Sequence, residues 1–319
     1  MKDRVIQISI QGYGRRMLGY LTEMYPIPSR LAISALLYLS FVLLLGKVNG
    51  HQPALLSGFT LVGIFDIFAV SLILRLMDEL KDRDLDRKLF ADRPLPSGRV
   101  RETDIKLSLF IACLTYVLVN SLTGVALVSA LAVLGYTFLM FTYFFMPVSW
   151  HKHLLVNLAT HNPVVPIILA HISVLFSVQR GLQPTDIAWS PTLTLIGMFW
   201  TLFLSWEIAR KIRYRHEETE YVTYSRILGR VGAVAMAVAI QTLGFAAANY
   251  FFVTLDLTVC FPLLLSVGYV YLICQYVRFL RGTLSAGIDL RGAAEVYAVN
   301  TMAAVVIELL IIPVVYHVS

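Results

Sequence analysis

Three aspartates at a four-residue spacing are the residues of this sequence best suited to chemistry. Asp78, Asp82 and Asp86 would share one face of a helix, each about 6 Å along the axis from the one before. Carboxylates at this spacing repel one another unless positive charge lies among them, and basic neighbours or a divalent cation can supply it. Mg²⁺ is commonly held by one or two carboxylates together with phosphate oxygens. The spacing therefore fits either a solvated charged loop or a site that binds magnesium and a phosphate group.

A second charged cluster follows a later apolar segment. Glu207 lies inside that segment, where an unpaired carboxylate is costly and a functional role is favoured. An ion pair of Glu207 with a cation in the next helical turn is the alternative. In the functional interpretation, Glu207 and Glu218 would complete a second metal site, and arginine and lysine side chains would neutralise the phosphates. The cations that we expect to bind phosphate are Lys81, Arg93, Lys152, Arg210, Lys211 and Arg213.

A diphosphate neutralised in this way becomes a good leaving group. If it is attached to an allylic isoprenoid, its loss leaves a carbocation, which needs a dry, apolar cavity. His161 could orient an acceptor in that cavity or take up a proton, although a structural hydrogen bond is an equal alternative. Other polar residues in apolar surroundings are candidates for the acceptor site or the cavity wall, namely Asn157, Asn162 and Tyr224.

Three further polar residues, Asp66, Asn300 and Glu308, fall inside apolar segments. Each would be costly against lipid, so we expect each to face the interior of a helix bundle. Spacing along the chain assigns none of them a partner.

The composition places the chain in a bilayer. Of its 319 residues, 58% are hydrophobic and only 14% are charged, and the mean hydropathy is +0.73. Nine apolar stretches each approach the roughly 20 residues that a helix needs to cross a hydrocarbon core of about 30 Å. We expect a tight turn at residues 121–124 and an interruption of the fifth stretch at Asn162-Pro163. The stretches are residues 27–47, 54–77, 104–121, 124–146, 154–178, 190–209, 229–250, 254–277 and 293–316.

The lysine and arginine residues fall almost entirely on one side of these nine spans. With the N-terminus on that side, 24 of the 26 lie there, and only Lys47 and Arg180 lie on the other. Positive charge is retained in the cytoplasm, so the N-terminus and both acidic clusters are predicted to be cytoplasmic. Topology accounts for the net charge of +6, which argues against nucleic acid as a partner.

The chain divides by composition into two parts. Residues 1–26 form a basic amphipathic segment that we expect to lie on the membrane surface, with breaks at Gly12 and Gly14. We expect residues 27–319 to form a single all-α domain of nine membrane-spanning helices.

The first aspartate cluster resembles a known family motif. The segment from Asp78 to Gly98 contains Arg93-Pro94-Leu95-Pro96-Ser97-Gly98 and is similar to the first Asp-rich motif of UbiA-type intramembrane prenyltransferases. That motif reads N-x-x-x-D-x-x-x-D and is followed by R-P-L-P-S-G. Asp82 and Asp86 match it, whereas Asp78 stands where the family usually has Asn, and the spacer from Asp86 to Arg93 is shorter than usual.

The resemblance extends over nearly the whole chain. Nine spans, acidic loops after spans two and six, and the entry to span five from Pro147 to Lys152 also look like that family. It implies a nine-helix bundle whose central cavity opens to the cytoplasm, with Mg²⁺ bound by Asp78, Asp82, Asp86, Glu207 and Glu218. The second motif departs from the family pattern, D-x-x-x-D, because no aspartate follows span six in this region.

The expected function is Mg²⁺-dependent transfer of a prenyl group from an isoprenyl diphosphate to an aromatic or other lipophilic acceptor. Membrane lipids are the other expected partner, and the oligomeric state stays open. A terpene cyclase of the same superfamily is the first alternative, because it needs the same ionisation without an acceptor. A transporter or lipid-binding protein, whose acidic loops merely bind ions, is the second.

Overall fold

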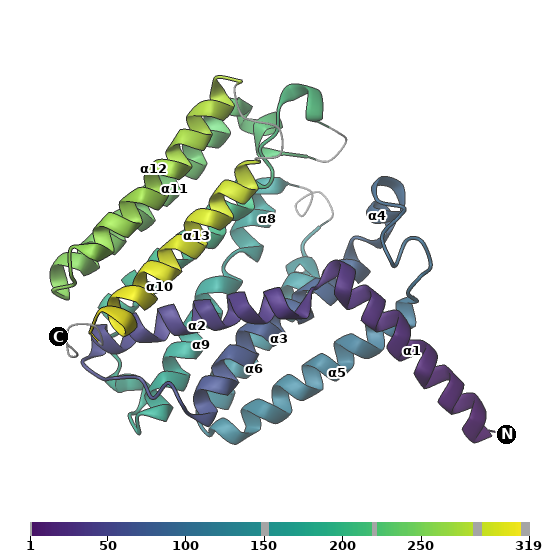
Figure 1. The fold of residues 1–319 in the computed structure, drawn as a ribbon. Coiled ribbons are helices and arrows are strands. Elements are labelled where there is room, and N and C mark those ends of the chain that lie inside the picture. Colours follow the sequence, from purple (N-terminus) through teal and green to yellow (C-terminus); the bar gives the residue numbers. More distant parts are fainter. Residues whose placement is uncertain (1, 148–152, 219–221, 283–288, 314–319) are drawn as a thin grey trace. The chain divides into compact units, whose positions relative to one another are not determined.

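The computed structural model describes residues 2–147, 153–218, 222–282 and 289–313. Every regular element within these ranges is a helix (Figure 1). The all-α class predicted from composition is confirmed. The chain forms two compact units, one from Met1–Ala35 with Leu56–Phe145 and the other from Leu36–Leu55 with Met146–Ser319. Each unit is described by itself below.

The first unit carries the three aspartates. Its helices come from two separate segments of the chain. Within the unit, α3 packs against α5 and α6. The helix α2 begins in this unit and ends in the second. The elements are α1 (Lys2–Met24), the start of α2 (Ile27–Asn49), α3 (Gly58–Lys81), α4 (Arg83–Leu89), α5 (Glu102–Asn120), the 3₁₀ turn η1 (Ser121–Thr123), α6 (Ala126–Phe141) and η2 (Tyr143–Phe145).

The second unit carries the other acidic cluster. Its largest contacts join α10 with α11 and α12 with α13, and α13 also packs against α10. The elements are α8 (Leu154–His161), α9 (Val164–Gln179), η3 (Pro184–Asp186), α10 (Trp189–Ala209), η4 (Arg215–Glu217), α11 (Tyr224–Thr254), α12 (Cys260–Leu280), α13 (Leu290–Val306) and η5 (Ile307–Ile311), a π-helical turn.

Eight helical segments of the described chain are long and apolar enough to cross a membrane. Their mean hydropathies lie between 1.4 and 2.1, as in a multi-pass integral membrane protein. The remaining predicted span, residues 124–146, corresponds to α6, which is apolar but has only 16 residues. Eight of the nine predicted spans therefore match a helical segment of membrane-spanning length.

Local backbone features match the expected breaks in two places. Gly124 has φ 62° and follows η1, so a residue without a side chain makes the tight turn between α5 and α6. The fifth span is interrupted where expected, since α8 ends at His161 and α9 begins at Val164. The expected breaks at Gly12 and Gly14 are wrong, because α1 runs unbroken from Lys2 to Met24. A glycine inside a helix is less favourable than an alanine by only about 1 kcal/mol, and the stability of the remaining helix exceeds this cost.

The three isolated polar residues have structural partners. Asn120 donates through Nδ2 to Asp66 Oδ1 at 2.7 Å, which joins α5 to α3. Glu308 accepts from Thr258 N and Oγ1 at 2.5 and 2.7 Å. Asn300 donates to the Leu264 carbonyl at 2.9 Å. Each bond satisfies a polar group in an apolar setting, so tertiary structure accounts for these residues.

Close packing of α11 on α10 gives a first testable prediction. A Cβ atom at Gly244 would collide with Thr201 Oγ1, so Gly244→Leu should force the two helices apart. Overpacking of this kind costs about 1–3 kcal/mol, and we expect a lower midpoint of thermal unfolding in detergent. Gly197→Leu on α10 is the matched control, because its added Cβ would meet no atom within 4 Å. Equal midpoints for the two variants would contradict the packing described.

Candidate functional site

The three aspartates follow one another in successive helical turns. The amide of Asp82 donates to the Asp78 carbonyl, and the amide of Asp86 donates to the Asp82 carbonyl, both at 2.8 Å. Asp82 lies between the last residue of α3 and the first of α4, and its backbone departs from helical geometry (φ −95°, ψ 6°), although the i,i+4 hydrogen bonds continue through it. The spacing thus places the three residues on one helical face, as predicted.

Their environments differ along that face. Asp78 is exposed and Asp82 is half-buried, whereas the Asp86 side chain is only 9% exposed. Arg93 donates through Nη1 to both carboxylate oxygens of Asp86, each at 2.9 Å. The predicted metal ligand Asp86 and the predicted phosphate-binding Arg93 therefore form an ion pair.

The segment after Arg93 folds back in a way that holds the pair. Ser97 N donates to the Arg93 carbonyl and Val100 N to the Pro94 carbonyl, both at 3.0 Å. Gly98 adopts φ 78°, a left-handed conformation in which a side chain would be strained. These turns constrain the backbone that follows Arg93. The R-P-L-P-S-G segment thereby helps to position the Arg93 side chain.

Lys81 also has partners within its unit. Its Nζ donates to the Met140 carbonyl at 3.0 Å and lies 3.8 Å from the centroid of the Tyr143 ring. A cation at the carboxyl end of α6 is favoured there by the helix dipole and by the ring. A role for Lys81 in phosphate binding stays a prediction.

The sequence interpretation missed a partly buried ion pair beside the aspartates. Glu79, which follows Asp78 directly, is 1% exposed and forms an i,i+4 ion pair with Arg75 on α3. The i,i+4 spacing of these two opposite charges within an apolar helix was the available signal.

In the second unit, Glu207 is held by two cations. Its carboxylate accepts from Arg210 Nε and Nη2 at 2.5 and 2.8 Å, and Lys211 Nζ lies 3.0 Å away. This is the ion-pair alternative anticipated from the sequence. The pairing explains how a carboxylate is tolerated at the end of a membrane-spanning helix, and it leaves the proposed metal role of Glu207 a prediction.

Glu218 makes hydrogen bonds with hydroxyls at the start of α11. Thr223 Oγ1 donates to both of its oxygens at 2.8 and 2.6 Å, and Ser225 Oγ donates at 2.7 Å. Ser225 Oγ also accepts from the Arg213 amide at 2.9 Å, while the side chain of Arg213 is exposed. The buried Tyr224 donates its amide to the Lys211 carbonyl at 2.9 Å. These bonds tie the loop after α10 to the start of α11.

The polar residues of the interrupted span lie around its break. Asn162 Oδ1 accepts from Trp200 Nε1 at 2.5 Å, and His161 Nδ1 lies 3.0 Å from Thr160 Oγ1. Asn157 is different, because its buried Oδ1 has no hydrogen-bond partner among the described residues. A buried unpaired acceptor suits a group that awaits a ligand or water. Lys152 lies outside the described residues.

The two cations that hold Glu207 should not be equivalent. The Lys211 side chain is 10% exposed and that of Arg210 is 37% exposed. Lys211→Ala should destabilise the protein by about 1–3 kcal/mol, because it weakens a pairing shielded from water. Arg210→Ala should cost less than about 1 kcal/mol. Thermal unfolding of both variants tests this, and a larger loss for Arg210→Ala would contradict the geometry.

The acidic residues of the first unit fit a metal that is bound together with phosphate. Within the ranges that the structure describes, no three His, Cys, Asp or Glu side chains are gathered as a metal site. Asp78 and Asp82 offer two carboxylates one helical turn apart. Mg²⁺ is held by such a donor set when waters and phosphate oxygens complete its shell.

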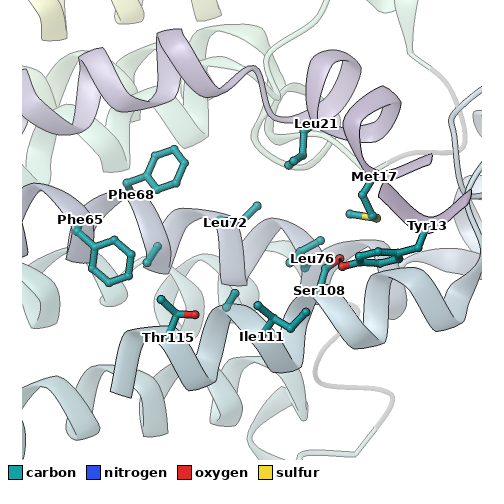
Figure 2. Close-up of a pocket in the computed structure, with 12 residues that line it drawn as sticks. Tyr13, Met17, Leu21, Phe65, Phe68, Leu72, Leu76, Ser108, Ile111 and Thr115 are labelled. Atoms are coloured by element: carbon teal, nitrogen blue, oxygen red, sulfur yellow. Dashed lines mark hydrogen bonds between the residues drawn. The ribbon is translucent and has the colours of Figure 1, made fainter. Parts of the chain in front are cut away.

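An apolar pocket of about 280 Å³ lies within the first unit. Figure 2 shows side chains of α1, α3 and α5 around it, among them Met17, Phe65, Phe68 and Leu72. The hydroxyls of Tyr13 and Ser108, 2.8 Å apart, supply polar atoms at its wall. The lining suits a hydrocarbon chain and no charged group.

Comparisons with known proteins agree on the fold. No protein-family model and no curated protein matches the chain. A digeranylgeranylglyceryl phosphate synthase, studied in membranes, shares 13% identity with a TM-score of 0.63, over 93% of this chain and 100% of that chain. A UbiA homolog from Aeropyrum pernix K1 shares 13% identity with a TM-score of 0.65, over 85% of this chain and 94% of that chain. The chain therefore has the fold of UbiA-type intramembrane prenyltransferases, as the resemblance of its first aspartate motif predicted.

Proposed function

We propose that this protein is an intramembrane prenyltransferase that ionises an isoprenyl diphosphate with the help of Mg²⁺. One observation carries the proposal. Asp78 and Asp82 stand one turn apart at the end of a membrane-spanning helix, next to the Asp86–Arg93 pair. Carboxylates for a metal and an arginine for phosphate thus occur together where a polar head would meet an apolar tail. The fold shared with UbiA-type proteins supports the same conclusion.

In this proposal, each group has a defined task. Asp78, Asp82 and Asp86 would hold Mg²⁺, which would withdraw charge from the diphosphate oxygens when bound. Arg93 and Lys81 leave their present partners and bind the phosphates. The allylic C–O bond then breaks heterolytically, and its electron pair leaves with the diphosphate. The apolar surroundings keep water from the carbocation.

The second unit carries the other charged groups of the proposal. Glu207 and Glu218 are the proposed ligands of a second metal, and the cations Lys152, Arg210, Lys211 and Arg213 are the proposed phosphate contacts. We place both clusters at the cytoplasmic face, because that orientation puts 24 of 26 lysines and arginines inside.

Transfer requires an acceptor nucleophile. An acceptor atom attacks the carbocation, a new bond to carbon forms, and the acceptor loses a proton to a base. His161 is the proposed base, and Asn157, with its unpaired buried oxygen, is proposed to orient the acceptor with Asn162 and Tyr224. An aromatic or other lipophilic compound fits this reaction.

Product analysis tests the proposal. Purified protein would receive geranyl, farnesyl or geranylgeranyl diphosphate with Mg²⁺, with and without a mixture of lipophilic aromatic acceptors. We expect a prenylated acceptor, formed only when an acceptor is present. A cyclic hydrocarbon or alcohol formed without an acceptor would favour the terpene cyclase. Unchanged substrate at every chain length would favour a transporter or lipid-binding protein.

A further inference from the structure

Three buried polar atoms lie on α1 and α3 next to the start of the aspartate face. The Tyr20 hydroxyl, Arg75 Nε and Glu79 Oε2 have no hydrogen-bond partner among the described residues. Tyr20 is 0% and Glu79 is 1% exposed. An unpaired buried polar atom costs about 1–3 kcal/mol, so stability alone does not account for their presence.

These side chains interact with one another and with the site. The buried Glu79 forms an ion pair with Arg75, whose side chain is 28% exposed, and such a pair by itself stabilises a protein little. Burial raises the pKa of the Tyr20 hydroxyl, the Glu79 carboxylate raises it further, and the Arg75 guanidinium opposes the rise. Glu79 also interacts electrostatically with Asp86 and Arg93. The Tyr20 hydroxyl on α1 thus interacts with the Arg75–Glu79 pair, and Glu79 interacts in turn with the Asp86–Arg93 pair.

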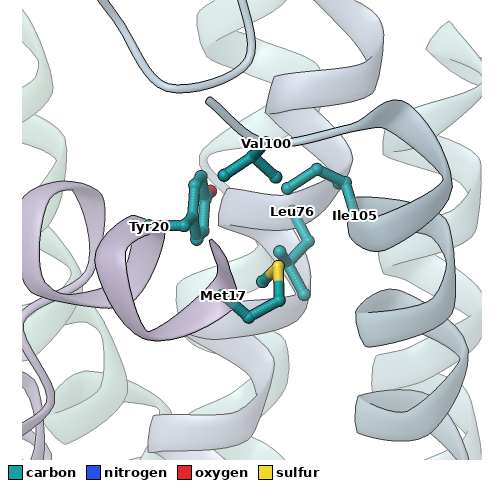
Figure 3. Close-up of a cluster of buried hydrophobic side chains, with 5 residues drawn as sticks. All are labelled: Met17, Tyr20, Leu76, Val100 and Ile105. Carbon is teal, nitrogen blue, oxygen red and sulfur yellow. The ribbon is translucent and has the colours of Figure 1, made fainter. Parts of the chain in front are cut away.

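Tyr20 is held in place by apolar packing at both ends of the aspartate segment. Figure 3 shows its ring among Met17, Leu76, Val100 and Ile105. Leu76 lies two residues before Asp78, and Val100 lies two residues after Gly98. The N-terminal helix thus touches the chain immediately before and immediately after the motif.

Two ion pairs fasten α1 on either side of Tyr20. Arg16 Nε and Nη2 donate to the Asp104 carboxylate at 2.6 and 2.7 Å. Arg99 Nη1 and Nη2 donate to the Glu23 carboxylate at 2.6 and 3.0 Å. Together with the packing of Tyr20, these ion pairs attach α1 to the start of α5 and to the residues that follow the motif.

The rotation of α3 about its axis determines where the aspartates point. Successive helical residues are turned by about 100°, so the buried Glu79 and the exposed Asp78 face different directions. We propose that Tyr20, Arg75 and Glu79 are positioning residues, a buried polar network through which α1 sets the rotation of the last turn of α3. The network would thereby place the Asp78 and Asp82 carboxylates for the metal and diphosphate. The inference rests on the proposed function for the identity of that ligand.

Tyr20→Phe separates positioning from stability. Removing an unpaired buried hydroxyl should leave the thermal midpoint unchanged or raise it. Positioning predicts that function is impaired, with a rise of about threefold to tenfold in the Mg²⁺ concentration that gives half-maximal turnover. Amide deuterium exchange in residues 78–89 should also become faster, and this readout needs no turnover.

Tyr25→Phe is the matched control. Tyr25 lies just after α1 and is also buried against α3, where its hydroxyl bonds with Ser71 Oγ at 2.5 Å and the Phe68 carbonyl at 2.8 Å. This variant should lower the thermal midpoint and leave the Mg²⁺ requirement and the exchange of residues 78–89 unchanged. Glu79→Gln should raise the Mg²⁺ requirement, and adding Tyr20→Phe to it should raise the requirement little further.

The outcomes decide between the two proposals. Unchanged exchange and an unchanged Mg²⁺ requirement in Tyr20→Phe would overturn the positioning role, as would additive effects of the two substitutions. If the wild-type protein shows no Mg²⁺-dependent turnover, the proposed function fails. The exchange measurement then still tests whether Tyr20 holds the last turn of α3.

Discussion

Asp82→Ala should abolish turnover of prenyl diphosphates while the protein still folds. Asp82 is the middle residue of the aspartate face and lies between α3 and α4. Loss of one preorganised group that stabilises charge in a transition state costs about 10²–10³-fold in rate, and loss of a metal ligand should cost at least as much. Steady-state turnover in detergent or lipid discs would measure the effect, with thermal unfolding as the check on folding.

Asp84→Ala is the control for that experiment. Asp84 is in the same segment and carries the same charge, but its side chain is 82% exposed. Its ion pairs with described residues are at the surface, with Arg83 at 3.5 Å and Arg87 at 3.9 Å. It should retain turnover within about twofold, because exposed ion pairs contribute little. Equal turnover by the two variants would show that activity does not depend on which side of the helix carries the aspartate.

Arg93→Ala should produce the second largest effect. It removes the partner of the buried Asp86 carboxylate, which should cost about 1–3 kcal/mol in stability. It also removes the proposed phosphate contact, so the KM for the prenyl diphosphate should rise about tenfold to a hundredfold, as for the loss of a charge-assisted hydrogen bond. Thermal unfolding and steady-state kinetics measure the two effects separately.

Arg93→Lys distinguishes the two roles of this arginine. Lysine keeps a charge for Asp86 but cannot reproduce the forked geometry of a guanidinium. It should recover most of the lost stability and only part of the lost affinity. If Arg93→Ala lowers the thermal midpoint and leaves KM unchanged, Arg93 serves Asp86 alone and does not bind substrate.

Much of the fold could be predicted from the pattern of apolar residues. Runs of about 20 such residues must become helices in a bilayer, because no water is available to the backbone there. The end of α6 was less predictable. Tyr143, Phe144 and Phe145 adopt φ values of 51°, 56° and 56°, a left-handed turn that aromatic residues rarely form. The turn follows α6, which ends at Phe141. The helix therefore ends five residues before residue 146, the predicted end of the span.

The candidate site could be predicted only in part, because the sequence does not reveal which residues come into contact in the tertiary structure. Periodicity placed Asp78, Asp82 and Asp86 on one face because that relation is local to one helix. The pairing of Asp86 with Arg93 depends on the end of α4 at Leu89 and on the turn in which Arg93 N donates to the Phe90 carbonyl, and helical periodicity does not predict where such a turn returns the chain. Tyr20 was passed over for the same reason, since its contacts with Leu76 and Val100 are distant in sequence.

Release of inorganic diphosphate is the most direct test of the central claim, which is that the aspartate face activates a prenyl diphosphate with Mg²⁺. Purified protein would be incubated with geranyl, farnesyl and geranylgeranyl diphosphates, first with a chelator and then with Mg²⁺ restored. We predict release from at least one substrate with Mg²⁺, none with the chelator, and none from Asp82→Ala. Absence of release at all three chain lengths, or release that persists with the chelator, would contradict the account.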